Sequence, residues 1–203
     1  MAFLRIKSIR KSGKNGKASI YDYVYEVESF KKRGKVKQKT IGLVGKYLRM
    51  EKVCNENFPI EKALQCDSKE KLLREIFTLN LANYGFLQEK PGIFKKNSIV
   101  ANLNTCKVFD CNSKKPVYID MHGKFFGTKT LKNIFKSENM TLFEFVKAVV
   151  ASGAVCIESL DIKNLKESAD PNLKLLQAIL DKFEPSDKIE HMDFDKFTEE
   201  FGY

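Results

Sequence analysis

The feature that most constrains the fold of this chain is the alternation of apolar and charged residues over its first fifty positions. The alternation recurs in three stretches, Phe3–Ile9, Ile20–Phe30 and Val36–Val44. A period of two is that of a half-buried β-strand, and the tyrosines and valines of the second stretch favour strands. Turn residues separate the stretches, with an Asn-Gly pair inside Lys11–Lys17 and Gly34 inside Lys31–Lys35. The sequence therefore predicts a three-stranded antiparallel meander over residues 1–50, with Gly42 as a candidate bulge.

The same alternation assigns side chains to the two faces of the meander. In the first strand Arg5 and Lys7 lie on one face, opposite Leu4 and Ile6. In the second strand one face holds Tyr21, Tyr23, Tyr25 and Val27. The other face holds three acids, Asp22, Glu26 and Glu28. If the tyrosines face the core, the exposed side mixes lysines with these acids, and cross-strand pairs neutralise part of the charge. This interpretation assigns binding mainly to the bases of the turn and the hairpin tip.

Positive charge is concentrated in this predicted meander. Residues 1–50 hold 14 lysines and arginines against three acids, a net charge of +11, whereas residues 51–203 hold 22 bases and 23 acids, a net charge of −1. Such asymmetry indicates a nucleic-acid partner, because each phosphate that Lys or Arg neutralises releases condensed counterions. We expect DNA rather than RNA, bound with little sequence specificity because no recognition helix carries the charge. The predicted nucleic-acid-binding residues are the bases of the strands, turn and tip: Arg5, Lys7, Arg10, Lys11, Lys14, Lys17, Lys31, Lys32, Arg33, Lys35, Lys37 and Lys39.

The rest of the chain alternates between helical and strand patterns. Residues 51–67 resemble a connection with a short helix at Pro59–Gln65, and residues 68–203 are predicted to form a mixed domain. Apolar stripes at helical spacing predict helices at Lys71–Tyr84, Thr128–Ser137, Met140–Ser152, Pro171–Phe183 and Asp193–Phe201. Short apolar runs predict strands at Ser98–Leu103, Lys107–Asp110, Pro116–Met121 and Ala154–Leu160, the second and third joined as a hairpin. The predicted fold class is α+β, with Ser68 as a helix cap and a capping box at Thr141 and Glu144.

No catalytic motif stands out in the sequence. The chain lacks a phosphate-binding loop and a nucleophile elbow, and His122 reads as an exposed loop histidine. The chain has five cysteines, and this odd number predicts reduced thiols. Cys106 and Cys111 could be zinc ligands, but the sequence offers no further ligands at the spacing of a zinc site. We therefore expect neither metal nor cofactor. A metal-dependent nuclease using Asp110 and Asp120 stays open as an alternative.

Further alternatives concern partners and location. The same basic surface could dock an acidic protein, and self-association is also open. The last twenty residues hold seven acids and two lysines, which predicts a solvated helix or a segment that screens the basic module. No apolar run approaches the length that spans a bilayer, and charges interrupt the N-terminus before any signal-peptide core develops. The expected location is the cytoplasm, with no membrane partner.

Residues 1–45 also resemble a known protein family. The matching positions are Phe3, Arg5, Lys7, Tyr23, Glu28, Ser29, Gly34, Lys35, Gln38, Ile41 and Gly45. This pattern resembles the extreme N-terminal region of DDE insertion-sequence transposases and of short archaeal relatives, a region taken to help hold transposon DNA. The rest of the chain is too short for an RNase H-like catalytic domain, so the resemblance implies DNA contact and not transposition. The leading expectation is a non-enzymatic DNA-binding protein.

Overall fold

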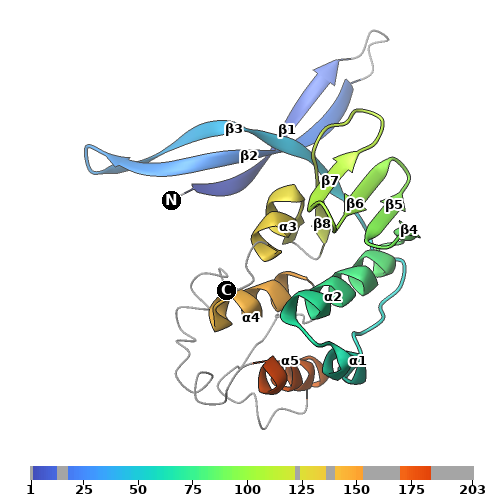
Figure 1. Cartoon of the computed structure of the whole chain (residues 1–203). Helices are drawn as coiled ribbons and strands as arrows, with labels where there is room; N and C mark the ends of the chain where they lie inside the picture. The colour runs from blue at the N-terminus through green and yellow to red at the C-terminus, as the bar shows by residue number, and fades with distance from the viewer. Residues whose placement is uncertain (1, 13–17, 122–123, 136–139, 153–169, 184–203) are drawn as a thin grey trace. The chain divides into compact units, whose positions relative to one another are not determined.

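The chain has an α+β fold, as predicted, and divides into two compact units (Figure 1). The structure, a computed structural model, describes residues 2–12, 18–121, 124–135, 140–152 and 170–183. Unit 1 combines Met1–Glu51 with Gln88–Lys132, and unit 2 combines Lys52–Leu87 with Asn133–Tyr203. This division differs from the predicted one at residues 50 and 68, because a strand from the second half of the chain pairs with the N-terminal meander.

Unit 1 is built on a five-stranded sheet of order β1-β2-β3-β8-β9. Its strands are β1 Ala2–Ser12, β2 Ala18–Lys32, β3 Lys35–Arg49, β8 Val117–Met121 and β9 Lys124–Phe126. The pairs β1–β2, β2–β3 and β8–β9 are antiparallel, and β3–β8 is parallel. The predicted meander is confirmed, with longer strands than the alternation alone outlined. The addition of β8 and β9 to its edge was not foreseen.

Strand β3 is irregular where β8 joins it. Its register with β2 shifts twice, so that Ile41 and Val44 have no partner and form bulges on either side of Gly42. The predicted irregularity is therefore present, but the bulged residues are Ile41 and Val44, and Gly42 itself pairs with Glu26. At Gly45 a Cβ atom would lie 2.7 Å from the Pro116 carbonyl oxygen, so the close approach of β8 requires glycine there.

The hairpin between β2 and β3 extends past the end of β1. Its two loop residues, Arg33 and Gly34, have φ values of 52° and 73°. Positive φ at both central positions is the mark of a type I′ turn, whose twist matches that of the flanking strands. Because Ala2 of β1 pairs with Glu28, residues 29–38 form a two-stranded ribbon with no third strand. The ribbon projects by about 13 Å, from four residues per strand.

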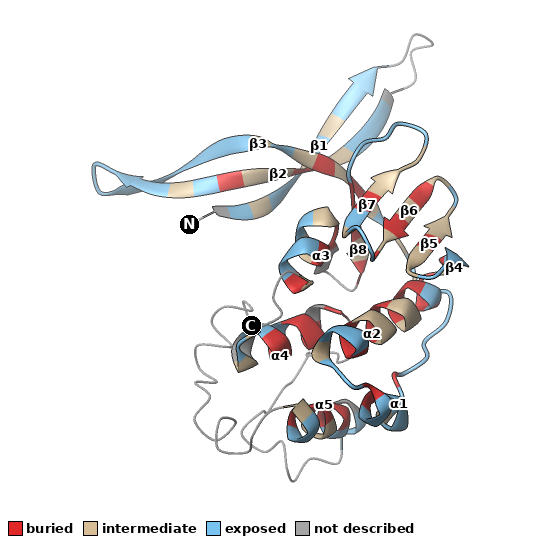
Figure 2. Cartoon of the chain, viewed as in Figure 1, coloured by how far each residue is buried: buried red, intermediate tan, exposed pale blue. Residues whose placement is uncertain are grey.

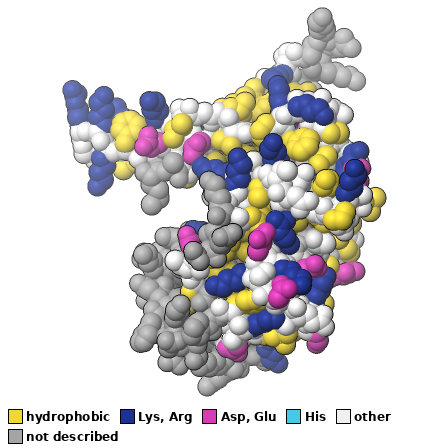
Figure 3. Space-filling view, viewed as in Figure 1, with side chains coloured by type: hydrophobic (Ala, Val, Ile, Leu, Met, Phe, Trp, Pro, Cys, Tyr) yellow, Lys and Arg dark blue, Asp and Glu magenta, His cyan; other side chains and the backbone are white. Residues whose placement is uncertain are grey.

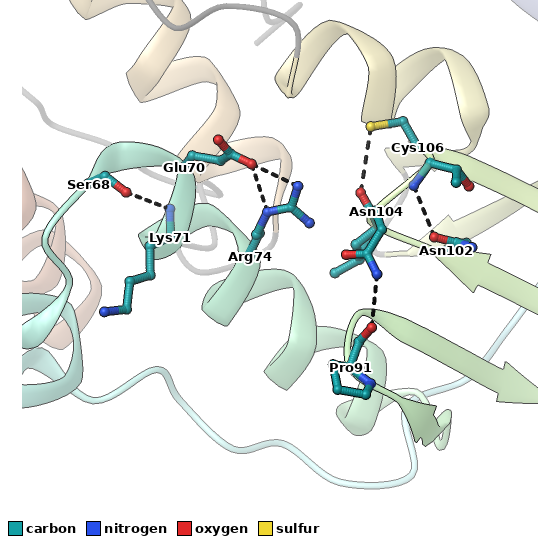
Figure 4. Close-up of polar contacts among 10 residues, drawn as sticks. Ser68, Glu70, Lys71, Arg74, Pro91, Asn102, Asn104 and Cys106 are labelled. Atoms are coloured by element: carbon teal, nitrogen blue, oxygen red, sulfur yellow. Dashed lines mark hydrogen bonds and ion pairs between the residues drawn. The ribbon is translucent and has the colours of Figure 1, made fainter.

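A second sheet of order β4-β5-β6-β7 completes the strands of unit 1. Its members are β4 Leu87–Lys90, β5 Ile93–Lys96, β6 Ile99–Asn102 and β7 Lys107–Asp110. Asn104 donates to the Pro91 carbonyl oxygen at 2.9 Å, which fixes the turn at Gly92 (Figure 4). The predicted hairpin between Lys107–Asp110 and Pro116–Met121 is wrong. Those strands belong to different sheets and share one isolated bridge, because β8 takes its partners from β3 and β9.

One face of the β1–β3 sheet carries a buried hydrophobic cluster of unit 1, and Figure 2 marks buried residues in red. Val24, Tyr47 and Tyr118 are buried together there, with Leu4 and Val44 packed against them. Helix α3 (Thr128–Ile134) is tied to the same face by an ion pair of 2.6 Å between Lys129 and Glu26. The predicted helix Thr128–Ser137 thus exists, but it ends at Ile134, before Phe135.

Unit 2 is helical in its described residues. Its helices are α1 Ile60–Gln65, α2 Lys69–Asn83, α4 Leu142–Ala151 and α5 Pro171–Phe183. Ser68 caps α2 by accepting from the Lys71 backbone N–H (Figure 4), and the capping box of Thr141 and Glu144 is present as predicted. The predicted strand Ala154–Leu160 and helix Asp193–Phe201, and the acidic segment 184–203, lie outside the described residues. None of the helices described is long and apolar enough to cross a membrane.

Candidate nucleic-acid interface

The predicted binding residues fall on β1, β2, β3 and the hairpin turn. Ten of the twelve are described, and Lys14 and Lys17 lie outside the described residues. Within the described part of the chain, none of the ten forms an ion pair with a carboxylate. No described carboxylate is therefore bound directly to these ten bases.

The strand register assigns each base to a face. Arg5 lies opposite Tyr25, Lys7 opposite Tyr23 and Lys31 opposite Val36. Directly paired residues share a face, so these bases lie on the side that carries the tyrosines, which we call the tyrosine face. It bears five bases and no acid from β1, β2 or β3, the bases being Arg5, Lys7, Lys11, Lys31 and Lys46.

The opposite side, which we call the Val24 face, carries all three acids of β2. Asp22, Glu26 and Glu28 lie there with the other predicted binding residues of the strands, namely Arg10, Lys32, Lys35, Lys37 and Lys39. Glu28 is directly opposite Lys39, so the expected mixture of lysines and acids holds on this face. Glu26 is bound to Lys129 of α3.

The tyrosines do not belong to the buried cluster of this sheet, which lies on the opposite face. Val24 is fully buried, whereas Tyr21 on the other face is 37% exposed and Tyr23 and Tyr25 are half-buried. The reason is that Tyr118 from β8 packs on the Val24 face, far from the meander in sequence. The tyrosine row is thereby left accessible, although Val27 at its ribbon end is buried.

The bases of the tyrosine face contact neutral groups. Lys7 donates to the Thr40 hydroxyl at 2.9 Å and lies 4.9 Å from the ring centre of Tyr25. Lys11 lies 5.5 Å and 5.6 Å from the ring centres of Tyr21 and Tyr23. Arg5 donates to the Gln38 side-chain oxygen at 3.0 Å. These contacts orient the cations over aromatic rings without neutralising them.

The two-stranded ribbon, residues 29–38, is the most basic part of the sheet. It holds five exposed bases and no acid, namely Lys31, Lys32, Arg33, Lys35 and Lys37. Figure 3 shows Lys and Arg side chains gathered at the free end of the hairpin. Because side chains alternate along a strand, the bases project from both sides of the ribbon.

The fold adds bases that sequence reasoning missed. Unit 1 holds 23 bases and seven acids, a net charge of +16, whereas unit 2 holds 13 bases and 19 acids, a net charge of −6. The gain comes from residues 88–132, with nine bases against three acids. This local excess was visible in the sequence, but averaging over residues 51–203 concealed it.

The two carboxylates of the nuclease alternative are engaged elsewhere. Asp110 accepts from the Asn112 backbone N–H at 2.9 Å, a bond that holds the pKa of Asp110 below its usual range. Asp120 accepts from the Tyr47 hydroxyl and lies 3.7 Å from Arg49. Burial raises the pKa of Tyr47, and Asp120 adds to that rise. Among the described residues no three His, Cys, Asp or Glu side chains lie close enough together to hold a metal ion. His122 is outside the described residues.

Comparison with known proteins returned no matching family model, no matching curated protein and no matching solved structure. The resemblance of residues 1–45 to transposase N-terminal regions therefore stays a prediction. Function has to be inferred from the chemistry of the interface itself.

Proposed function

We propose that this protein is a non-enzymatic, cytoplasmic DNA-binding protein that inserts the ribbon of residues 29–38 into duplex DNA. One observation carries the proposal: the ribbon exposes five bases, contains no acid and makes no ion pair with any described residue. The high positive charge of the rest of unit 1 supports it, because it raises the local concentration of a polyanion.

The shape of the ribbon favours B-form DNA over RNA. The major groove of B-DNA is about 12 Å wide and admits a two-stranded β-ribbon. The major groove of A-form RNA is deep and narrow, and side chains do not reach into it. Bases on both sides of the ribbon suit a groove whose two walls are phosphate backbones. Lys31 lies on one side, and Lys32 and Lys35 lie on the other.

The composition of the ribbon supports binding with little sequence specificity. Lysine acts as a point charge toward phosphates, whereas Arg, Asn and Gln present the planar groups that suit bidentate contacts with base edges. The ribbon has one arginine, at the turn, and one glutamine, Gln38, which accepts from Arg5. Phosphate contacts therefore dominate the proposed complex.

Salt-dependent binding of a labelled DNA duplex tests the proposal. Each phosphate contact contributes about 0.9 to the salt slope, which is about eightfold in affinity at about 100 mM salt. Changing Lys32→Ala and Lys35→Ala together should weaken binding about 60-fold and lower the slope by about 1.8. A matched control in unit 2, Lys71→Ala with Lys174→Ala, removes the same charge and should leave affinity within about threefold. Equal losses in both variants would show that net charge, and not the ribbon, binds DNA.

Docking of an acidic protein is a second candidate, favoured by apolar side chains exposed on the same strands. Ile20, Val36 and Leu43 are 70%, 66% and 60% exposed. Phosphates offer nothing to such groups, whereas protein interfaces bury them. Weak duplex binding with a flat response between about 50 and 200 mM salt would favour this candidate over DNA.

A further inference from the structure

We infer that the tyrosine face is a second nucleic-acid site, which binds single strands by stacking unpaired bases on Tyr21, Tyr23 and Tyr25. This inference rests on the proposed function, since it names a further form of nucleic acid for the same unit. The ribbon holds a duplex through its phosphates, and the tyrosine face takes bases that are not paired.

The spacing of the three rings suits planar bases. The tyrosines alternate along β2, so successive rings start about 6.6 Å apart. Stacked bases are about 3.4 Å apart, so every second base of a stacked strand matches the spacing of neighbouring tyrosines. The rings are anchored in the sheet yet accessible: Tyr21 is 37% exposed and the other two are half-buried.

Cations lie over the rings. Lys11 is nearly equidistant from Tyr21 and Tyr23, at 5.5 Å and 5.6 Å from their centres. Lys7 lies 4.9 Å from the centre of Tyr25. A strand whose bases stack on the rings would therefore place its phosphates beside ammonium groups. Electrostatic tracking of the backbone combined with aromatic stacking is how sequence-tolerant single-strand sites are built.

The charge of the face matches this ligand and disfavours an acidic surface. No carboxylate from β1, β2 or β3 lies on it, whereas the Val24 face carries three. The polar partners of its cations are neutral groups, such as the Thr40 hydroxyl at 2.9 Å from Lys7.

A duplex would not use the rings, because its base faces are already stacked inside the helix. An unpaired strand presents the π-faces of every base. Phe3, which is 37% exposed, extends the accessible row of aromatic side chains. This row therefore favours a single strand over a duplex as the ligand.

Binding of labelled oligo(dT) and of a labelled duplex to the whole chain tests the inference. Loss of stacking on one ring lowers affinity by about 5- to 150-fold. The variant Tyr21→Ala, Tyr23→Ala, Tyr25→Ala should bind oligo(dT) at least about 100-fold more weakly, with duplex affinity changed less than about threefold. The matched Tyr→Phe triple keeps the rings and should bind both ligands as the parent does. If the alanine triple melts early, Tyr21→Ala alone, at the most exposed ring, should still lose about tenfold.

Tyrosine emission gives a second readout, because the chain has no tryptophan and seven tyrosines. Oligo(dT) should quench the parent protein, and the phenylalanine triple should bind the oligonucleotide without the part of the quenching that these three tyrosines supply. Unchanged oligo(dT) affinity in the alanine triple, with duplex binding intact, would overturn the inference and leave the proposed function standing. If the alanine triple lost affinity for oligo(dT) and for the duplex equally, the tyrosine face would not be a site separate from the duplex site, and the inference would be overturned. A parent protein that binds neither ligand would remove the proposed function itself.

Discussion

The two faces of the β1–β3 sheet are made by the same strands but differ in charge and in what packs on them. The Val24 face is covered where Tyr47 and Tyr118 pack on it, and its acid Glu26 is held by Lys129. The tyrosine face holds five bases, exposed or half-buried rings and no acid from these strands. The difference teaches that the alternation of the sequence determines which side chains share a face. Packing by residues from elsewhere in the chain determines which face stays accessible to solvent.

The largest expected contrast comes from placing the same carboxylate on each face. Val24 is fully buried and Val36, on the tyrosine side of the ribbon, is 66% exposed. Val24→Asp should lower the free energy of unfolding by about 4 kcal/mol or more, because it buries an ionisable group in the core. Val36→Asp should change it by less than about 0.5 kcal/mol. Urea unfolding followed by circular dichroism measures both values.

The exposed member of this pair should also affect DNA binding, while the fold is retained. Val36→Asp adds one negative charge to the ribbon and should weaken duplex affinity about eightfold at about 100 mM salt. If Val36→Asp destabilised the fold as strongly as Val24→Asp, Val36 would have to be buried in the core. The proposed difference between a buried Val24 face and an accessible tyrosine face would then be wrong.

A smaller contrast compares two glycines of β3. At Gly45 a Cβ atom would lie 2.7 Å from the Pro116 carbonyl oxygen, whereas at Gly42 it would meet nothing within 4 Å. Because backbone atoms cannot move aside cheaply, Gly45→Ala should destabilise the protein by about 1–3 kcal/mol. Gly42→Ala should be neutral or stabilise it by up to about 1 kcal/mol, since it restricts the unfolded chain. Thermal unfolding of the two variants measures the difference, and equal melting points would refute the tight approach of β8.

Local signals were enough to predict the parts of the fold that short segments determine. The period of two gave β1, β2 and β3, and the Thr141–Glu144 spacing gave the capping box. Parallel pairing of β3 with β8 joins residues about seventy positions apart and leaves no local pattern. The false hairpin between Lys107–Asp110 and Pro116–Met121 arose because a short polar loop between two strands has the same composition whether or not the strands pair.

The sequence predicted which residues belong to the candidate site better than it predicted how those residues are arranged in space. Charge counting selected the bases, because electrostatic excess is a property of composition. The alternation correctly grouped Tyr21, Tyr23 and Tyr25 on one face, but it could not say that this face is accessible. That outcome depends on Tyr118 and Lys129, which reach the opposite face from the second half of the chain.

The smallest expected contrast compares two acids of the Val24 face. Glu26 lies 2.6 Å from Lys129, with both side chains partly exposed, whereas Glu28 is exposed and lies opposite Lys39. Glu26→Gln should cost about 0.5 kcal/mol of stability, because a partly exposed ion pair is screened by water. Glu28→Gln should cost nothing measurable and should raise duplex affinity by about two- to eightfold, because it removes the acid nearest the ribbon. Paired urea unfolding and duplex titrations distinguish the two acids. A stability loss at Glu28 equal to that at Glu26 would mean that the ribbon end of this face is also held by the fold, and the free surface would then shrink to the tyrosine side alone.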